Sequence, residues 1–270
     1  MNAVILAAGQ GVRLRPITNT APKCLTLVSG KPILEHELDA LDAAGIQDCT
    51  IVVGYRGNQI RDQFGPRFKR LRLTYVENPD YRTTNNLYSL WLARKNIASA
   101  TILIEGDLVF SKELMQRLIS APAADVAVVD EFRTEQNGTV VRGPDSQIQE
   151  FILKSDQGPG FDYSNTAKTV NLYKFSKATM RDYFLPGLDR YVAAKQTNVF
   201  YEAVLAEIVA DKSLRMDMIF PDGCPWMEID TLEDLQIAEA LFKPTARIAV
   251  KPKHAARTLN WNPRVTKRSV

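Results

Sequence analysis

The chain has 270 residues, 45% of them hydrophobic and 24% charged, and a formal net charge of +3. A chain of this length and ordinary globular composition can bury a large core, so one α/β domain with additions is expected rather than two equal domains. No apolar run is long enough to span a membrane, and an apolar, strand-like segment stands at the N-terminus in place of a basic leader. Neither a transmembrane helix nor a secretory signal is therefore expected.

The first 23 residues combine a predicted strand with a cationic loop. Residues 3–8 form a short apolar run typical of a buried strand, and a glycine-containing loop follows. Gly9 and Gly11 allow the backbone to approach a bulky ligand and to point N–H groups at phosphate oxygens. Arg13 offers a planar fork for oxyanions, and Lys23 offers a compact point charge. The segment therefore predicts a binding site for a polyanion.

Other interpretations of this segment are weaker. A dinucleotide-binding G-x-G-x-x-G motif needs a third glycine where Leu14 stands, and the G-x-x-x-x-G-K-[ST] phosphate loop is absent. A plain surface turn after an edge strand leaves three cations and two prolines without a purpose.

Strands and helices alternate in the next part of the chain. The spacing of leucines predicts a helix over residues 33–44, and a short helix is expected around residues 60–64. Apolar runs predict buried strands at residues 50–53, 73–76 and 100–105. This alternation predicts a doubly wound, mostly parallel sheet, whose ligands bind at the carboxyl ends of the strands.

Polar residues follow the predicted strands at residues 73–76 and 100–105. Residues 83–98 are expected to form a helix capped by Thr84 or Asn85. Because a helix N-terminus also attracts anions, Asn86 is equally consistent with a capping role and with a ligand contact. Asp107 follows the strand at residues 100–105 and would lie in the cationic cleft. Mg²⁺ prefers one or two carboxylates with phosphate oxygens and water, so Asp107 is a candidate ligand, although alone it would suggest only a turn.

After residue 125 the pattern becomes that of an antiparallel sheet. Alternating or apolar runs predict strands at residues 125–129, 139–142, 147–153 and 168–175. Two helices and a strand are then expected at residues 177–194, 198–211 and 214–220. Finally, Thr231 and Asp234 have the spacing of a capping box that begins a last helix.

Several motifs give the chain a resemblance to known enzymes. The pattern L-x-x-G-x-G-x-R-L-x-P-x-T-x-x-x-P-K, followed by Gly30-Lys31-Pro32, resembles the signature of nucleotidyltransferases that join a nucleoside triphosphate to a phosphorylated small molecule. The runs N-N-L-Y-S-L, T-V-N-L-Y-K-F-S and F-Y-E-A-V-L resemble phosphocholine and phosphonate cytidylyltransferases. The resemblance implies a Rossmann-like, GT-A-like nucleotidyltransferase domain over residues 1–243. A small antiparallel β extension, at about residues 125–230, would bind the acceptor.

The resemblance also implies roles for individual residues. Arg13 would hold the leaving pyrophosphate, and Lys23 would neutralise charge at the α-phosphate and the acceptor. Asp107 and Asp230 would bind Mg²⁺, although Asp230 also fits a helix cap. The residues expected beside the nucleotide are Leu6, Ala7, Ala8, Gly9, Gly11, Gly54, Tyr55, Asn78, Asn86 and Ser89. Those expected beside the acceptor are Lys154, Tyr173, Tyr201, Glu202, Trp226 and Glu228.

The expected reaction joins CTP to 2-aminoethylphosphonate or phosphocholine with release of pyrophosphate, and it needs no protein nucleophile. A cationic head group favours aromatic faces and carboxylates, so one hypothesis is that Glu202 and Tyr201 meet an ammonium group. The sequence is equally consistent with Tyr201 packing in a helix interface. One alternative is a sugar-1-phosphate nucleotidyltransferase that uses UTP, dTTP or GTP. Another is a catalytically inactive nucleotide-binding subunit, which has no need of Arg13, Lys23, Asp107 and Asp230 together.

Charge is distributed unevenly along the chain. Residues 244–270 hold seven Lys and Arg and no acid, whereas residues 1–243 carry 27 basic and 31 acidic side chains, a net charge of −4. Such a tail can touch nucleic acid or a membrane, but a solvated extension or a linker to a partner enzyme is favoured, and a homodimer is an alternative. Three cysteines without metal-ligand spacing suit a reducing cytoplasm.

Overall fold

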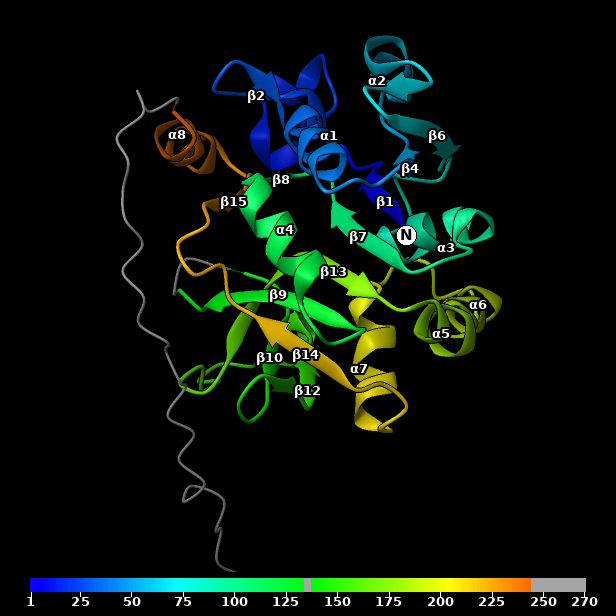
Figure 1. Cartoon of the computed structure of the whole chain (residues 1–270), viewed down its shortest axis with the longest axis vertical. Helices are drawn as coiled ribbons and strands as arrows, with labels where there is room; N and C mark the ends of the chain where they lie inside the picture. Colours follow the sequence, from blue (N-terminus) through cyan, green and yellow to red (C-terminus); the bar gives the residue numbers. More distant parts are fainter. Residues whose placement is uncertain (134–136, 244–270) are drawn as a thin grey trace, which may run out of the picture.

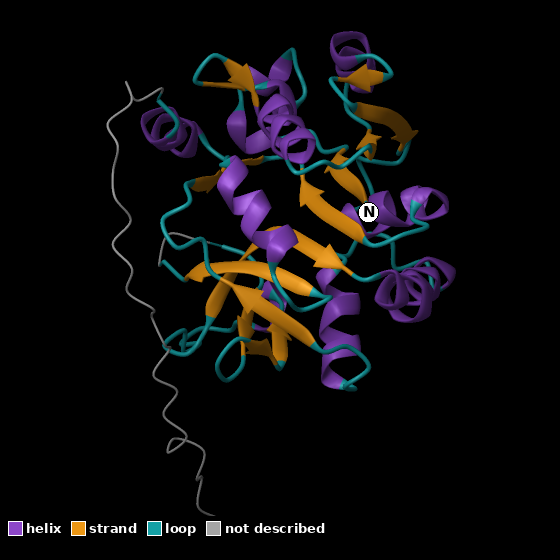
Figure 2. Cartoon of the chain, in the orientation of Figure 1, coloured by secondary structure: helices purple, strands orange, loops and turns teal. Residues whose placement is uncertain are grey.

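The computed structural model describes residues 1–133 and 137–243, and most of its strands belong to one twisted sheet with helices on both faces (Figures 1 and 2). The strands of this sheet are β1 Asn2–Ala7, β4 Asp48–Val53, β5 Arg67–Phe68, β6 Leu71–Glu77, β7 Thr101–Glu105, β9 Val126–Glu131, β10 Val140–Arg142, β11 Gln147–Ile148, β12 Glu150–Ile152, β13 Ala167–Phe175 and β14 Met216–Ile219. Two separate ribbons pair β2 Leu27–Val28 with β3 Lys31–Pro32, and β8 Leu108–Phe110 with β15 Trp226–Glu228.

The helices and the strand order complete the description. The α-helices are α1 Ile33–Ala43, α2 Gly57–Phe64, α3 Asn86–Ala93, α4 Lys112–Ser120, α5 Lys177–Thr179, α6 Leu185–Ala193, α7 Glu202–Ala210 and α8 Leu232–Leu241. The sheet runs in the order β11, β14, β9, β13, β7, β1, β4, β6, β5, with β10 bonded to β13 and β12 bonded to β10.

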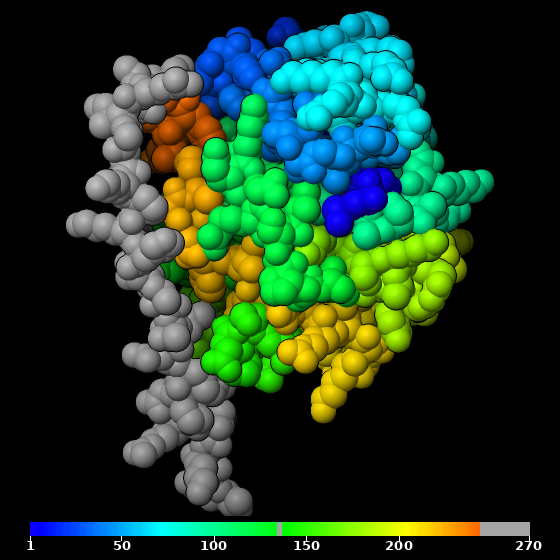
Figure 3. All heavy atoms as spheres, viewed as in Figure 1, coloured from blue at the N-terminus to red at the C-terminus, as the bar shows by residue number. Residues whose placement is uncertain are grey.

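The parallel half of the sheet consists of β6, β4, β1 and β7. All six residues of β1 are buried, and the five apolar ones, residues 3–7, alternate between two hydrophobic cores. Ala3 and Ile5 pack in the core that includes residues of α1 and α4, whereas Val4 and Leu6 pack in the core that includes residues of α3 and α7. On the face shown in Figure 3, the dark-blue N-terminus reaches the surface between the blue segment that contains α1 and the blue-green segment that contains α3. Burial on both faces is what a doubly wound parallel sheet requires, so the predicted fold class is confirmed.

The second half of the sheet is built around β13, which is antiparallel to both β7 and β9. Its register against β9 shifts between Thr169 and Tyr173, and Asn171 has a φ of 62°. Such an irregularity bends a strand and re-aims its side chains. Strand β14 pairs with β9 in parallel, a pairing that the sequence did not predict.

Several predicted elements have different boundaries. The helix predicted over residues 177–194 is divided into α5, a π-helical turn at Met180–Phe184, and α6, which has a proline in its first turn. The predicted helix over residues 83–98 begins only at Asn86, because Asn85 is extended and its side chain accepts a hydrogen bond from the Asn86 N–H. The strand predicted over residues 147–153 is divided into β11 and β12.

Two further expectations concern membrane spans and the basic tail. Across residues 1–133 and 137–243, no helix has the length and apolar character needed to cross a bilayer. The predicted basic tail, residues 244–270, lies outside the described residues.

Candidate active site

A pocket lies where β1 and β7 end and α3 begins. It is lined by most of the residues that were predicted to contact the nucleotide: Leu6, Ala7, Ala8, Gly9, Gly11, Asn78, Asn86 and Ser89. The four charged residues predicted for catalysis and metal binding also line it: Arg13, Lys23, Asp107 and Asp230. The position agrees with the rule that doubly wound sheets bind ligands beyond the carboxyl ends of their strands.

Other lining residues were not predicted as site residues: Val12, Cys24, Tyr81, Thr84, Asn85, Glu105, Gly106 and Phe200. Glu105 had a usable signal, because it ends a buried strand two residues before Asp107. Phe200 had none, since a lone aromatic before a helix does not reveal whether it faces the core or solvent. It is 55% exposed.

Two residues predicted to contact the nucleotide do not line the pocket. A Cβ on Gly54 would lie 2.7 Å from the Ala8 carbonyl oxygen, so the glycine permits a close approach between the ends of β4 and β1. The Tyr55 N–H donates to the same carbonyl at 3.0 Å, and the Tyr55 hydroxyl donates to the Thr18 carbonyl at 2.9 Å. Gly54 and Tyr55 therefore stabilise the first loop through contacts with the backbone of Ala8 and Thr18.

The first loop holds Lys23 in place through close backbone packing. Gly11 has a φ of 59°, and its carbonyl accepts a hydrogen bond of 2.8 Å from the Thr18 hydroxyl. A Cβ on Gly11 would lie 2.9 Å from Lys23 Cβ. Because only glycine fits this conformation and this space without strain, Gly11 fixes the start of the Lys23 side chain.

We expect Gly11→Ala to lower the free energy of unfolding by about 1–3 kcal/mol, the usual cost of a strained left-handed residue. Gly9→Ala is the matched control, because Gly9 has no positive φ and a Cβ there would meet nothing within 4 Å. Thermal and urea unfolding of both variants test the comparison. Equal stability of the two variants would show that the loop adapts to the added methyl group.

A compact group of charges lies at one end of the pocket. Lys23 Nζ donates to Asp107 Oδ2 at 2.8 Å and to Asp230 Oδ1 at 2.7 Å, and Arg13 pairs with the same Asp230 oxygen at 2.8 Å. The Lys23 side chain is 12% exposed. Burial alone would lower its pKa, but the two aspartates raise that pKa above the usual lysine value. Lys23 is therefore a permanent cation between two carboxylates.

Local backbone contacts bring the two aspartates together. Strand β15 pairs with β8, and the Ile229 N–H donates to the Asp107 carbonyl at 3.0 Å. The Asp230 N–H donates to Asp234, while Thr231 is the N-cap of α8 in a complete capping box. The interpretation of Asp230 as the helix cap is thus wrong, and its carboxylate is free to face the pocket.

The site also contains a third carboxylate suited to a metal ion. One oxygen from each of Asp107, Glu228 and Asp230 lies within 4.8 Å of the others. Asp107 Oδ1 is buried and has no hydrogen-bond partner among the described residues. Three converging carboxylates with an unpartnered buried oxygen fit a hard divalent cation such as Mg²⁺. Glu228, predicted as an acceptor residue, lies with the predicted metal ligands.

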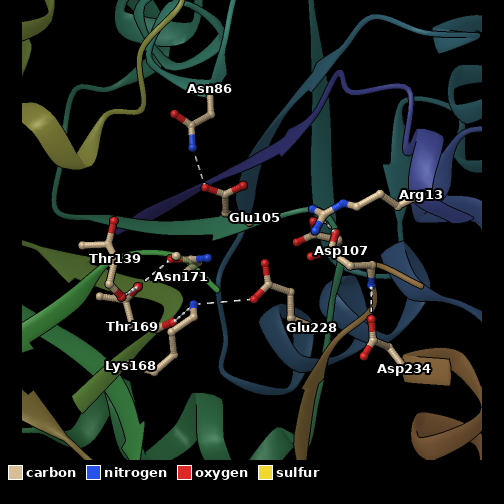
Figure 4. A network of polar contacts seen from close by, with 12 residues as sticks. Arg13, Asn86, Glu105, Asp107, Thr139, Lys168, Thr169, Asn171, Glu228 and Asp234 are labelled. Carbon is tan, nitrogen blue, oxygen red and sulfur yellow. Dashed lines mark hydrogen bonds and ion pairs between the residues drawn. The ribbon is translucent and has the colours of Figure 1, made fainter. Parts of the chain in front are cut away.

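Asn86 connects the pocket wall to the beginning of α7. Its side-chain nitrogen donates to Glu105 Oε1 at 2.7 Å, and its side-chain oxygen accepts from the Tyr201 N–H at 2.9 Å (Figure 4). The amide group of Asn86 is therefore fixed in one orientation, and it fixes Glu105 in turn.

Three glutamates from β7, α7 and β15 lie near one another: Glu105, Glu202 and Glu228. Burial, together with neighbouring acids, raises the pKa of Glu105 well above its usual value. Burial likewise raises the pKa values of Glu202 and Glu228 to about 7, although Lys168 opposes both shifts. Lys168 Nζ lies 3.6 Å from Glu228 Oε2 and donates to the Thr169 carbonyl at 2.7 Å (Figure 4). We call Glu105, Glu202 and Glu228 the acidic cluster.

The raised pKa of Glu202 predicts a pH dependence of stability. The folded protein binds this proton more tightly than the unfolded chain, whose carboxyl titrates near its ordinary value of 4.5. The free energy of unfolding should therefore fall as the pH rises from about 4.5 to about 7. In urea unfolding at pH 5 and pH 7.5, Glu202→Gln should lose less stability between the two pH values than the wild type. An unchanged difference would contradict the assignment.

Several predicted acceptor residues are placed differently from the expectation. Tyr173 and Tyr201 are 0% exposed and pack edge to face, with Phe184 against the second ring. The expectation that Tyr201 offers an open aromatic face to an ammonium group is therefore wrong, because core packing covers the ring. Lys154 is exposed and does not line the pocket, and the Trp226 indole donates to Asp130 at 2.8 Å.

Comparison with known proteins identifies the family. Residues 3–158 match the MobA-like NTP transferase domain. CMP-5'-(3-aminopropyl)phosphonate synthase of Streptomyces rubellomurinus is 34% identical over 90% of this chain, which spans 39% of that protein's length. The UTP–glucose-1-phosphate uridylyltransferase AglF of Haloferax volcanii is 33% identical over 66% of this chain and 73% of its own length.

The fold has close relatives among solved structures. CTP:phosphocholine cytidylyltransferase LicC of Streptococcus pneumoniae superposes with a TM-score of 0.68 at 24% identity, covering 90% of this chain and 99% of LicC. The match to the domain family covers more than half of the chain and includes the cationic loop, Asp107 and the strands between them. This chain belongs to the MobA-like NTP transferase family and is a nucleotidyltransferase.

Proposed function

We propose that this enzyme is a Mg²⁺-dependent cytidylyltransferase that joins CTP to a small phosphonate or phosphate acceptor with a cationic head group. The observation that carries the proposal is the position of Lys23 between Asp107 and Asp230, in a pocket that is also lined by Glu105. The names of two relatives, CMP-5'-(3-aminopropyl)phosphonate synthase and the pneumococcal CTP:phosphocholine cytidylyltransferase, support the same class of acceptor.

The reaction requires positioning and charge neutralisation more than a protein nucleophile. An acceptor oxygen forms a bond to the α-phosphorus of CTP while the bond from that phosphorus to the pyrophosphate oxygen breaks. Lys23 would donate hydrogen bonds to the α-phosphate and the acceptor as their charges approach. Arg13, which is 62% exposed at the pocket mouth, would hold the departing pyrophosphate.

The carboxylates Asp107, Glu228 and Asp230 would hold the metal ion. When bound there, Mg²⁺ would offset the negative charge of the phosphate oxygens. Lys23 would then exchange its aspartate partners for phosphate oxygens. The backbone of the loop from Gly9 to Gly11 would approach the triphosphate from the other side.

The acidic cluster favours a cationic acceptor over a sugar phosphate. Burying carboxylates is costly unless they are paired, and a substrate ammonium group would pair them. A sugar would instead require neutral hydrogen-bonding groups. The similarity to AglF nevertheless makes a sugar-1-phosphate nucleotidyltransferase the second candidate.

One assay distinguishes the candidates. Pyrophosphate release is measured for CTP, UTP, dTTP and GTP against 2-aminoethylphosphonate, phosphocholine, phosphoglutamine and glucose 1-phosphate, with and without EDTA. We expect the highest kcat/KM with CTP and a cationic phosphonate or phosphate, and no turnover with EDTA. Preference for UTP and glucose 1-phosphate would instead establish the second candidate.

A further inference from the structure

The acidic cluster has more carboxyl groups than the protein around it pairs with cations. In the part of the chain that the structure describes, no lysine or arginine forms an ion pair with Glu105 or Glu202. Lys168 forms an ion pair with Glu228 at 3.6 Å. Glu202 is 4% exposed, and its Oε2 atom has no hydrogen-bond partner among the described residues. A buried carboxylate in this condition is either protonated, as the raised pKa values of the cluster indicate when no ligand is bound, or paired with a cation from outside the chain. A substrate ammonium group in the pocket would supply that cation.

Glu105 is the member of the cluster that a ligand in the pocket reaches. It lines the pocket directly, whereas neither Glu202 nor Glu228 does. Asn86 engages Glu105 Oε1, so the carboxylate is held in place before any substrate binds. In the close view, the Glu105 carboxylate points toward Asn86, and a dashed line marks their hydrogen bond (Figure 4).

The distance from Glu105 to the proposed reaction centre suits a short acceptor. One residue, Gly106, separates Glu105 from Asp107, so their Cα atoms lie at most roughly 7 Å apart. A phosphonate held near Asp107 therefore carries a group two or three carbon atoms away into reach of Glu105. A triphosphate, by contrast, would be repelled by Glu105, which places the nucleotide on the Lys23 and Arg13 side.

The side chains around Glu105 favour some cations over others. A primary ammonium has N–H donors that carboxylate oxygens accept, which makes strong charge-assisted hydrogen bonds. A trimethylammonium has no such donor and is bound best over aromatic faces. The Tyr173 and Tyr201 rings beside the cluster are fully buried against each other and against Phe184. The site around Glu105, which offers carboxylate oxygens and no open aromatic face from Tyr173 or Tyr201, therefore suits a primary amine better than choline.

We propose that Glu105, held by Asn86, binds the primary ammonium group of an aminoalkyl phosphonate and makes the enzyme select such acceptors over neutral and quaternary ones. This inference rests on the proposed cytidylyltransferase function. Glu202 is a buried neighbour whose charge acts on Glu105. Asn86 is a positioning residue, because it acts through Glu105 and through the backbone of Tyr201.

The test compares Glu105→Gln with the wild type using CTP and two acceptors of similar size, 2-aminoethylphosphonate and neutral 2-hydroxyethylphosphonate. Glutamine keeps an oxygen that accepts from Asn86 and replaces the other carboxylate oxygen with an uncharged NH2 group. We expect kcat/KM for the amine to fall about 10- to 100-fold, mainly through KM, as is usual for a lost charge-assisted hydrogen bond. The KM for CTP should change little, and the preference for the amine over the alcohol should narrow by the same factor.

Two further variants make the outcome decisive. Glu105→Asp keeps the charge and should restore part of the amine preference. Glu113→Gln, on an exposed position of α4, should behave as the wild type. An equal loss for amine and alcohol in Glu105→Gln, or a wild-type preference for phosphocholine over 2-aminoethylphosphonate, would overturn the inference and leave the cytidylyltransferase function standing. A wild type that transfers cytidylyl to none of these acceptors would overturn the proposed function itself.

Discussion

Lys23→Met is expected to lower kcat with CTP by about 100- to 1,000-fold, the usual effect of removing one preorganised donor to developing charge. Lys23 donates hydrogen bonds to both aspartates from a mostly buried position. A water molecule that filled the place of its ammonium group would not supply a positive charge. Methionine keeps most of the volume and removes the ammonium group. Lys112→Met, at an exposed position of α4, is the control.

The same variant should change metal binding in the opposite direction. Without the ammonium group, Asp107 Oδ2 and Asp230 Oδ1 lose a cation that competes for them. Mn²⁺, measured by electron paramagnetic resonance without nucleotide, should therefore bind Lys23→Met more tightly than the wild type. Weaker Mn²⁺ binding in the variant would mean that Lys23 only organises the carboxylates.

Asp107→Asn is expected to abolish measurable turnover, with a loss of at least about 1,000-fold, since a bound metal supplies several kcal/mol of charge stabilisation. The backbone bond from Ile229 to the Asp107 carbonyl does not involve the side chain, so β8 and β15 should remain paired. The variant should therefore unfold near the wild-type temperature while losing Mn²⁺ affinity. Asp62→Asn, on the exposed side of α2, serves as the matched control.

Activity of Asp107→Asn within tenfold of the wild type would remove Asp107 from the metal site. Loss of activity with unchanged Mn²⁺ affinity would assign Asp107 to substrate positioning instead. The two readouts thus separate the metal role from a structural one.

Local sequence patterns predicted the sheet well, because apolar runs and turn residues act over short distances. The six buried residues of β1 and the glycine-containing loop after it are features of one continuous segment. The convergence of Lys23 with Asp230 is different, since 207 positions separate them in the chain. Before the structure, only the resemblance to nucleotidyltransferases connected Lys23 with Asp230. In the structure, the pairing of β15 with β8 brings Asp230 to this site.

The acceptor side was harder to predict because it depends on how helices rotate against the sheet. Tyr201 is the N-cap of α7, where side-chain periodicity does not show whether the residue faces the core or the pocket. Its ring packs against Tyr173 and Phe184, so an aromatic expected to face the substrate belongs to the core. Glu105 was overlooked because a glutamate at a strand end resembles an ordinary turn residue until its neighbours are known.

A crystal structure with CTP and Mg²⁺ tests most directly whether the loop cations and the distant carboxylates act on one triphosphate. We expect the α-phosphate within hydrogen-bond distance of Lys23 Nζ, Arg13 on the β- or γ-phosphate, and the metal ion held by Asp107 and Asp230. A triphosphate bound elsewhere, with Lys23 still joined to both aspartates and no metal between them, would contradict the account.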